Sequence, residues 1–169
     1  MLYGSNSTEV KVLLNYLKHT SDGRDSSWWN FKNKKILGWS IIPNVAYSCM
    51  QEYGKDVRLI TRCYIEPEYR TKNLQQQGTY VFQMIEEQID FVKAKQYNNA
   101  FISTEYTRHG VIKRHSRIAK EKYNLNCEVL EGKYKTCNGN ELNCHQNIGL
   151  YRLSDKPFGL PRVEWIFNY

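Results

Sequence analysis

Apolar residues along the chain follow two spacings, one typical of helices and one typical of strands. Helical spacing predicts helices over Thr8–His19, over about Lys72–Lys95 and over a basic stretch at 108–122. Short apolar and β-branched runs predict six strands: Ile36–Ile42, Val45–Glu52, Asp56–Glu66, Ala100–Thr104, Cys127–Cys137 and Gln146–Leu153. The order is one helix, three strands, the long helix, a strand, the basic helix and two strands. It predicts a mixed α/β (α+β) fold whose mainly antiparallel sheet is flanked by helices.

The chain shows no internal division. No linker, repeat or low-complexity tract interrupts its 169 residues, which predicts one domain over 1–169 with its core at 8–153. Residues 154–169 form a tail that ends in the aromatic segment Val163–Tyr169. Such a tail can add a strand, cover the core or face a partner subunit, and the last of these would make a homodimer.

Composition narrows the class of protein. Hydrophobic residues make up 41% of the chain, as in globular proteins, and no run of about 18 apolar residues suggests a membrane span. The first residues lack a signal-peptide pattern, and the five cysteines are scattered without a CxxC pair. We therefore expect a cytoplasmic protein without a disulfide framework or a metal site. The abundance of Asn, Lys, Tyr and Ile favours an AT-rich viral or phage source, whose protein would work in the host cytoplasm.

The positive charge of the chain is concentrated in one window. The net charge is +7, and residues 106–135 supply +5 of it, with eight Lys or Arg against three Glu. A concentrated basic patch attracts phosphates, either on a nucleotide cofactor or on nucleic acid. Arg114 and Arg117 on the predicted basic helix are the residues that we expect to contact a nucleic-acid backbone, whereas a solvated helix face is the alternative.

The segment CYIEPEYRTKNLQQ, residues 63–76, joins a predicted strand to the start of the long helix. Pro67 ends the strand, and Arg70 and Lys72 bring two cations to the helix start. The first N–H groups of a helix have no partner inside it, and their partial positive charge favours an anion. An ordinary strand-to-helix turn with a solvated arginine would give the same local pattern.

This segment, within that order of elements, resembles the GNAT superfamily of N-acetyltransferases. The run Ile65-Glu66-Pro67-Glu68-Tyr69-Arg70 matches the first half of the family motif, and residues 70–75 occupy the place of its glycine-rich half. The resemblance implies a GNAT-like fold that binds acetyl-CoA, with pyrophosphate on the helix start and pantetheine along the strand end. The implied cofactor-binding residues are Cys63, Tyr64, Ile65, Arg70, Thr71, Lys72, Asn73, Leu74, Gln75 and Gln76.

The resemblance also implies roles in acyl transfer to an amine, which needs a base, an oxyanion donor and an acid. The oxyanion donor would be a backbone N–H near Tyr64 or Ile65. Glu105 is the first choice for the base and Glu66 the second, and Tyr123 is the choice for the acid. His115 lies among apolar positions of its helix, so we interpret it as a core histidine rather than a catalyst.

Departures from the family motif and the basic charge suggest two further functions. Asn73 and Gln75 stand where the family has small residues, and a side chain there can fill the space of the phosphate. This favours a GNAT-like fold without catalysis, acting as a binding or structural component, for example of a virus. The basic helix favours instead a nucleic-acid-modifying enzyme similar to the phage Mom type. The amine acceptor of the first hypothesis is not specified by the sequence.

Overall fold

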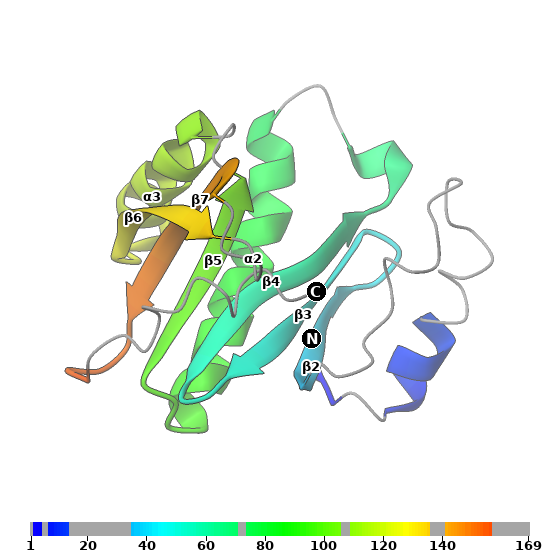
Figure 1. Cartoon of the computed structure of the whole chain (residues 1–169). Helices are drawn as coiled ribbons and strands as arrows, with labels where there is room; N and C mark the ends of the chain where they lie inside the picture. Colours follow the sequence, from blue (N-terminus) through cyan, green and yellow to red (C-terminus); the bar gives the residue numbers. More distant parts are fainter. Residues whose placement is uncertain are drawn as a thin grey trace. The chain divides into compact units, whose positions relative to one another are not determined.

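The computed structural model describes residues 2–4, 7–13, 35–70, 74–105, 109–135 and 141–156, with side chains at all of these except 74–77, 104–105, 109, 130–135 and 141–146. The strands are β1 (Leu2–Tyr3), β2 (Ile36–Ile42), β3 (Ala46–Tyr53), β4 (Asp56–Ile65), β5 (Asn99–Glu105), β6 (Cys127–Lys135) and β7 (Glu141–Arg152) (Figure 1). The two long helices are α2 (Leu74–Ala94) and α3 (His109–Tyr123). Residues 8–13 are also helical, and Pro67–Tyr69 forms a 3-10 turn.

The strands form a seven-stranded sheet in the order β1-β2-β3-β4-β5-β7-β6. The pairings of β1 with β2, β2 with β3, β5 with β7 and β6 with β7 are antiparallel, and β4 runs parallel to β5. This confirms the predicted mixed α/β class with a mainly antiparallel sheet. The chain divides into two compact units, Met1–Glu52 with Leu59–Phe91 and Tyr53–Arg58 with Val92–Tyr169, which are described separately.

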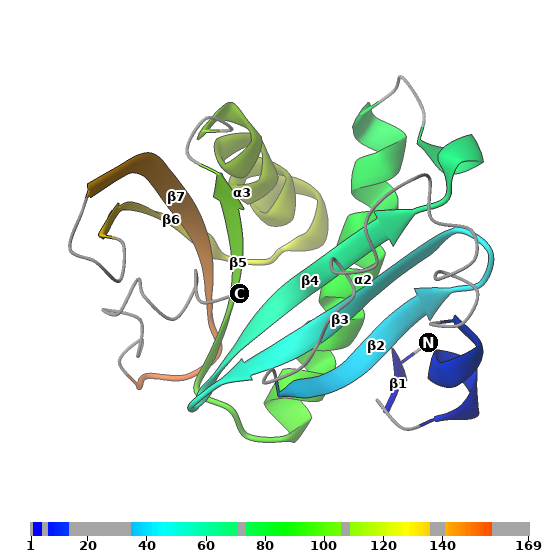
Figure 2. The same cartoon turned by 45° about the vertical axis from the view of Figure 1, so that its right-hand side comes forward.

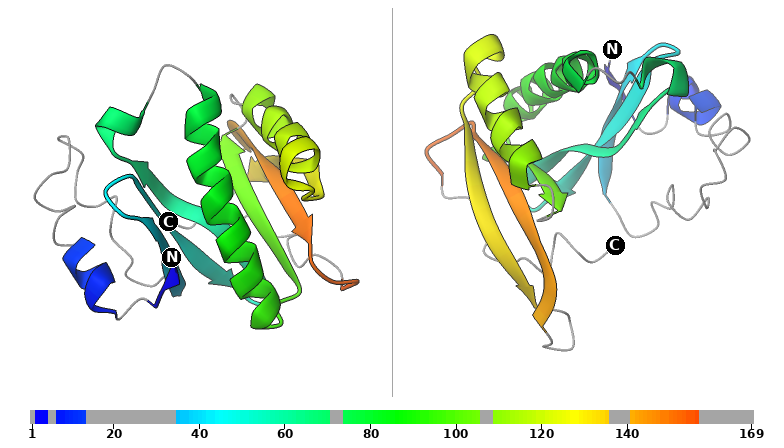
Figure 3. Two further views of the ribbon diagram at one scale, coloured as in Figure 1. Left: turned by 180° about the vertical axis from the view of Figure 1, so that it is seen from behind. Right: turned by 90° about the horizontal axis from the view of Figure 1, so that it is seen from above.

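In the first unit, the two faces of β2 and β3 bury different partners. One face gathers an apolar cluster: Val10, Leu13, Trp39, Ile41, Tyr47, Cys49 and Tyr64. Ser40 and Ser48 occupy intervening positions and contact Gln88 of α2. Because successive strand side chains point to opposite faces, α2 covers one face and residues 8–13 cover the other. Figure 2 shows β2, β3 and β4 side by side with α2 behind them, and Figure 3 shows that helix from the opposite side.

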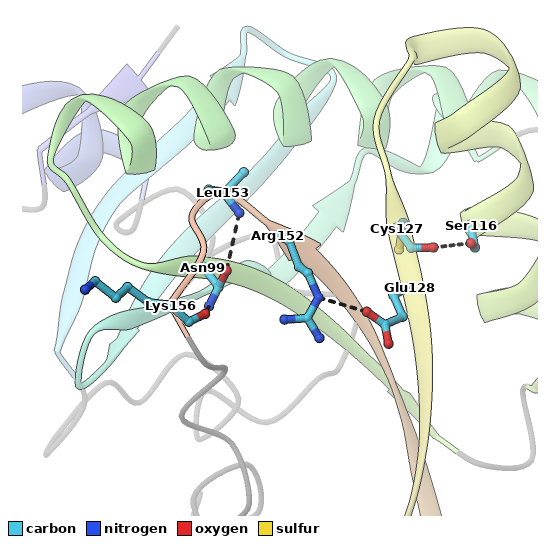
Figure 4. A network of polar contacts seen from close by, with 7 residues as sticks. All are labelled: Asn99, Ser116, Cys127, Glu128, Arg152, Leu153 and Lys156. Atoms are coloured by element: carbon cyan, nitrogen blue, oxygen red, sulfur yellow. Dashed lines mark hydrogen bonds and ion pairs between the residues drawn. The ribbon is translucent and has the colours of Figure 1, made fainter.

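In the second unit, α3 packs against β6 and β7. Its apolar face buries Ile112 and Ala119, and the Ser116 hydroxyl donates to the Cys127 carbonyl of β6. Gly149 of β7 leaves no room for a side chain between its neighbouring strands, because a Cβ there would lie 2.8 Å from Ile102 Cγ1 of β5 and 2.9 Å from Cys127 Sγ of β6. Figure 4 shows the Ser116 contact together with two hydrogen bonds of Asn99 and one ion pair elsewhere in this unit.

The two hydrogen bonds of Asn99 fix the chain after β7. The buried Asn99 amide donates to the Lys156 carbonyl at 3.2 Å and accepts from the Leu153 N–H at 3.3 Å (Figure 4). The ion pair is exposed, with Arg152 Nε 3.0 Å from Glu128 Oε2. Exposed pairs of this kind contribute little to stability, whereas a buried amide with two backbone partners is costly to remove.

The ends of two helices carry recognisable capping geometry. The first helical segment is capped by Ser7, whose Oγ accepts from the Val10 N–H at 3.2 Å. Helix α2 ends in a Schellman motif, with Gln96 N donating to the Lys93 carbonyl at 3.0 Å and Tyr97 N to the Val92 carbonyl at 3.2 Å. Gln96 takes the left-handed position of this motif at φ 58°.

Most element boundaries agree with the sequence prediction, and the largest difference is in the last hairpin. Strand β7 begins at Glu141, five residues before the predicted start, because its ladder with β6 continues to the pair Lys135 and Glu141. The polar residues of that stretch obscured the strand pattern. Three predicted features lie outside the described residues: the strand end at Cys137, the helix over residues 14–19 and the tail beyond residue 156. None of the helices in the described ranges combines the length and apolar character that crossing a bilayer requires.

Candidate functional site

Strand β4 contains two more residues than β3 over the same span. The two strands meet at the turn of residues 54–55, which joins Tyr53 to Asp56. At the other end, the Glu66 N–H donates to the Val45 carbonyl at 2.8 Å. Eight residue steps separate Tyr53 from Val45, whereas ten separate Asp56 from Glu66. The two extra residues must be taken up by a bulge within β4.

The bulge lies at Ile60 and Arg62. Both residues have a left-handed backbone, with φ 53° at Ile60 and φ 55° at Arg62. A left-handed backbone costs a residue with a Cβ about 1–2 kcal/mol, and a β-branched residue is among the least suited to it. Such strain persists only where surrounding contacts impose it, and both strain and bulges are enriched beside active sites.

Two buried side chains bond to the backbone of the bulge. Gln88 of α2 accepts from the Ile60 N–H through its Oε1 at 2.9 Å. Cys49 of β3 donates from its Sγ to the Thr61 carbonyl at 3.0 Å. Gln88 and Cys49 are both fully buried. The distorted backbone is therefore held by side chains on the helix and on the neighbouring strand.

Arg70 folds back onto the end of β4. Its Nε donates to the Ile65 carbonyl at 2.6 Å, and its guanidinium carbon lies 4.8 Å from the centre of the Tyr64 ring. The return is made by the 3-10 turn, in which the Arg70 N–H donates to the Pro67 carbonyl at 3.1 Å. The turn thus places a positive charge beside the last residues of the strand.

Glu66, the second choice for the base, is oriented by Tyr47. The Tyr47 hydroxyl donates to Glu66 Oε1 at 2.9 Å, and the Tyr47 ring stacks on Tyr64 with centres 6.2 Å apart. Glu66 is half-buried. A carboxylate has about four acceptor positions, so the bond from Tyr47 still allows Glu66 to accept a further proton donor.

The predicted pyrophosphate site lies where α2 begins, at Leu74. Thr71, Lys72 and Asn73 lie outside the described residues, as do the side chains of Leu74, Gln75 and Gln76. The roles of these residues therefore remain predictions.

The described residues offer neither a reactive thiol at Cys63 nor a cluster of metal ligands. Burial raises the pKa of Cys63 to about 12, so its thiol stays protonated at neutral pH. This agrees with a role for Cys63 through its backbone alone. Within the described ranges, no three His, Cys, Asp or Glu side chains gather closely enough to hold a metal ion.

Comparison with known proteins identifies the fold. No protein-family profile and no curated protein sequence matches the chain. Among solved structures it is similar to the ribosomal-protein-S18-alanine N-acetyltransferase from Escherichia coli, at TM-score 0.52 and 13% identity over 95% of this chain and 97% of that one. It is also similar to a probable acetyltransferase from Staphylococcus epidermidis, at TM-score 0.50 and 12% identity over 91% of this chain and 98% of that one. The chain has a divergent GNAT-like fold.

The other candidate residues of this GNAT-like chain belong to the second unit. Glu105 is the last residue of β5 and is paired with Gln146 of β7, and its side chain is outside the described set. Tyr123 is the last residue of α3 and is half-buried. Of the two predicted nucleic-acid contacts on α3, Arg117 is exposed and Arg114 is half-buried. Their catalytic and binding roles remain predictions.

His115 is a satisfied core histidine, as its place in the sequence predicted. Its Nε2 is hydrogen-bonded to the Tyr151 hydroxyl of β7, and burial lowers its pKa to about 4. Burial also raises the pKa of the adjacent Tyr151, and it raises that of Cys127 to about 11. All three groups are therefore uncharged at neutral pH, and they stabilise the packing of α3 rather than provide a nucleophile.

Sequence reasoning missed the residues that hold the bulge. Gln88 stands three residues after Ile85 and four before Val92, on the apolar stripe of α2. A glutamine on such a stripe is a usable signal, because a buried amide needs partners. The left-handed positions in β4 leave no comparable mark, since isoleucine and arginine do not indicate positive φ.

Proposed function

We propose that this protein is an acyl-CoA-dependent N-acyltransferase that transfers an acetyl group to an amine. The observation that carries the proposal is the bulged strand β4, strained at Ile60 and Arg62, running through a short turn into the start of α2. On a GNAT-like fold, this is the segment whose backbone would face the acyl donor. Strain of this kind has no stabilising value of its own, which favours a functional reason for it.

The described residues of this segment suit a phosphate-bearing thioester. The start of α2 offers N–H groups that lack partners inside the helix, and these favour an anion. Arg70 adds a positive charge that its bond to Ile65 and its contact with Tyr64 hold at the end of β4. The backbone of Cys63–Ile65 would pair with the pantetheine amides as an added strand does.

When bound, the acyl-CoA supplies an activated thioester carbonyl. A backbone N–H at Tyr64 or Ile65 would donate to the carbonyl oxygen as negative charge develops on it. Glu105, or Glu66 as second choice, would take the proton of the attacking amine, and Tyr123 would protonate the departing sulfur. One C–N bond forms and one C–S bond breaks, which gives an N-acetyl product and a free thiol.

Calorimetry with acetyl-CoA tests binding, and thiol release tests transfer. We expect saturable heat with one site per chain, and thiol release that depends on an added amine. A useful acceptor panel contains a peptide with a free N-terminal alanine, the same peptide with a blocked N-terminus, and a lysine peptide. Binding without release for every acceptor would favour the non-catalytic hypothesis, and the absence of binding would refute the proposal.

A second candidate function is the modification of nucleic acid, which the exposed face of α3 favours. Lys113, Arg117 and Lys120 are exposed and lie three or four residues apart, so they share one face of the helix. Such a face would neutralise backbone phosphates, and DNA affinity would then fall steeply with salt. Arg117→Gln should reduce the slope of log affinity against log salt by about one. A binding curve that is insensitive to salt would exclude this candidate.

A further inference from the structure

We propose that Gln88 is a positioning residue for acyl transfer, acting through the bulge of β4. This inference rests on the proposed function. It concerns a side chain in the interior of the first unit that would touch neither the acyl donor nor the acceptor. Its carboxamide joins three strands to α2 through the backbone of Ile60 and the hydroxyls of Ser40 and Ser48.

The contacts of Gln88 use both ends of its amide. Oε1 accepts from the Ile60 N–H at 2.9 Å, while Nε2 donates to Ser40 Oγ at 3.1 Å and to Ser48 Oγ at 3.0 Å. Gln88, Ser40 and Ser48 are all fully buried. A buried polar group that loses its partner is penalised, so these contacts constrain one another.

The direction of the Gln88 amide is determined by its neighbours. Ser48 Oγ donates to the Met84 Sδ at 3.3 Å, so the serine oxygen faces Gln88 as an acceptor. The NH₂ group of Gln88 must then point to the serines, because the reversed amide would set its NH₂ against the Ile60 N–H. Two donors facing each other in a buried site would both lack a partner.

The orientation of Gln88 in turn fixes the distorted part of β4. Ile60 keeps a left-handed backbone that its β-branched side chain disfavours, and the bond from its N–H to Gln88 offsets that cost. A bulge bends its strand and changes the direction of the later residues, so the backbone from the bulge to Ile65 takes its direction from it. In the proposed function, this stretch includes the oxyanion donor at Tyr64 or Ile65.

A near-isosteric substitution separates this role from general stability. Gln88→Met keeps the size and burial of the side chain but removes the acceptor for the Ile60 N–H. We expect kcat to fall by about tenfold to a hundredfold while KM for acetyl-CoA changes less, because the donor acts mainly in the transition state. Ser48→Ala removes one of the two groups that orient the amide, and it should shift kcat in the same direction by a smaller factor.

The matched control is Asn99→Leu, which removes another fully buried amide with two backbone partners. Asn99 belongs to the second unit, and its strand β5 pairs with the first residues of β4, Asp56–Arg58, and not with the bulge. The loss of kcat in Gln88→Met could reflect only a less stable protein. In that case Asn99→Leu should lose as much kcat when its melting temperature falls by the same amount. We expect Asn99→Leu to retain kcat below its own melting temperature.

A second readout does not depend on activity. Amide resonances of residues 60–65 in a ¹⁵N-labelled sample should shift in Gln88→Met and, less strongly, in Ser48→Ala, but not in Asn99→Leu. Resonances at the wild-type positions in Gln88→Met would overturn the inference, as would an unchanged kcat. If the wild type transfers no acyl group while these amides still shift, the positioning of the strand stands and the proposed function fails. Should Gln88→Met not fold, the same two readouts on Ser48→Ala decide the question.

Discussion

Replacing Arg70 by alanine removes two contacts at the end of β4 and one positive charge. The charged hydrogen bond from Nε to the Ile65 carbonyl, at 2.6 Å, belongs to a class that contributes about 1.5–3 kcal/mol. The contact with the Tyr64 ring, at 4.8 Å, adds about 0.5–1 kcal/mol. Arg70 is half-buried, so solvent weakens both interactions. We therefore expect Arg70→Ala to lower the free energy of unfolding by about 2 kcal/mol.

The same substitution should weaken acetyl-CoA binding. A charge-assisted bond to phosphate of about 1.4 kcal/mol corresponds to a tenfold change in Kd. Urea unfolding measures the loss of stability, which should lower the melting temperature by about 4–8 °C for a chain of this size. Calorimetry well below that temperature measures Kd. Arg70→Lys retains the charge without the planar fork, so its Kd should lie between those of the wild type and Arg70→Ala.

Lys35→Ala is the control for charge. Lys35 is exposed and pairs with Glu52 at 2.8 Å in the same unit, so its removal changes the net charge equally and costs at most about 1 kcal/mol. Its Kd for acetyl-CoA should equal that of the wild type. If Arg70→Ala binds acetyl-CoA as tightly as the wild type, or if Lys35→Ala weakens binding to the same extent, the assignment of Arg70 to the phosphate site is wrong.

Three further outcomes test the fold itself. Gln96→Gly should stabilise the protein by about 0.5–1 kcal/mol, because it removes the left-handed strain after α2. Gln83→Gly, on the exposed side of that helix, should instead destabilise the protein by about 1 kcal/mol. If the urea midpoints of both variants move in the same direction, the capping geometry is wrong. The pKa of His115 is lowered to about 4 from an unfolded value of 6.5, so the unfolded chain binds more protons between these values and stability falls as the pH drops through them. Between pH 7 and pH 5 the free energy of unfolding, measured with urea, should therefore fall by about 2 kcal/mol through His115. In His115→Gln this part of the pH dependence should be absent. Gly149→Ala would bring a methyl group within 2.8 Å of a side-chain carbon of Ile102 and should lower stability by about 1–3 kcal/mol, which a wild-type melting curve would disprove.

The sequence predicted the fold well because its patterns are local. Strand β2 has the predicted ends at Ile36 and Ile42, and α2 lies within two residues of its predicted start and one of its predicted end. The short apolar run of β2 and the apolar stripe of α2 reflect burial that each element imposes on its own residues. Strand β7 was misjudged at its start, since pairing with β6 rather than its own polar sequence makes residues 141–145 a strand.

The candidate site was predictable only in part. The motif at 63–76 located the strand end and the helix start, because prolines and clustered cations are visible in sequence. The bulge was not predictable, since the positive φ of Ile60 and Arg62 depends on contacts from Gln88 and Cys49 that are distant along the chain. The contact of Arg70 with Ile65 likewise depends on the geometry of the turn.

In the proposed function, the backbone after the β4 bulge and the opening turn of α2 bind an acyl-CoA. A crystal structure of the protein soaked in coenzyme A tests it most directly. We expect pyrophosphate on the N–H groups of residues 71–76 and the pantetheine arm along Cys63–Ile65. A structure in which the Gln75 side chain or the protein's own loop fills that position, or in which the coenzyme binds elsewhere, would contradict it.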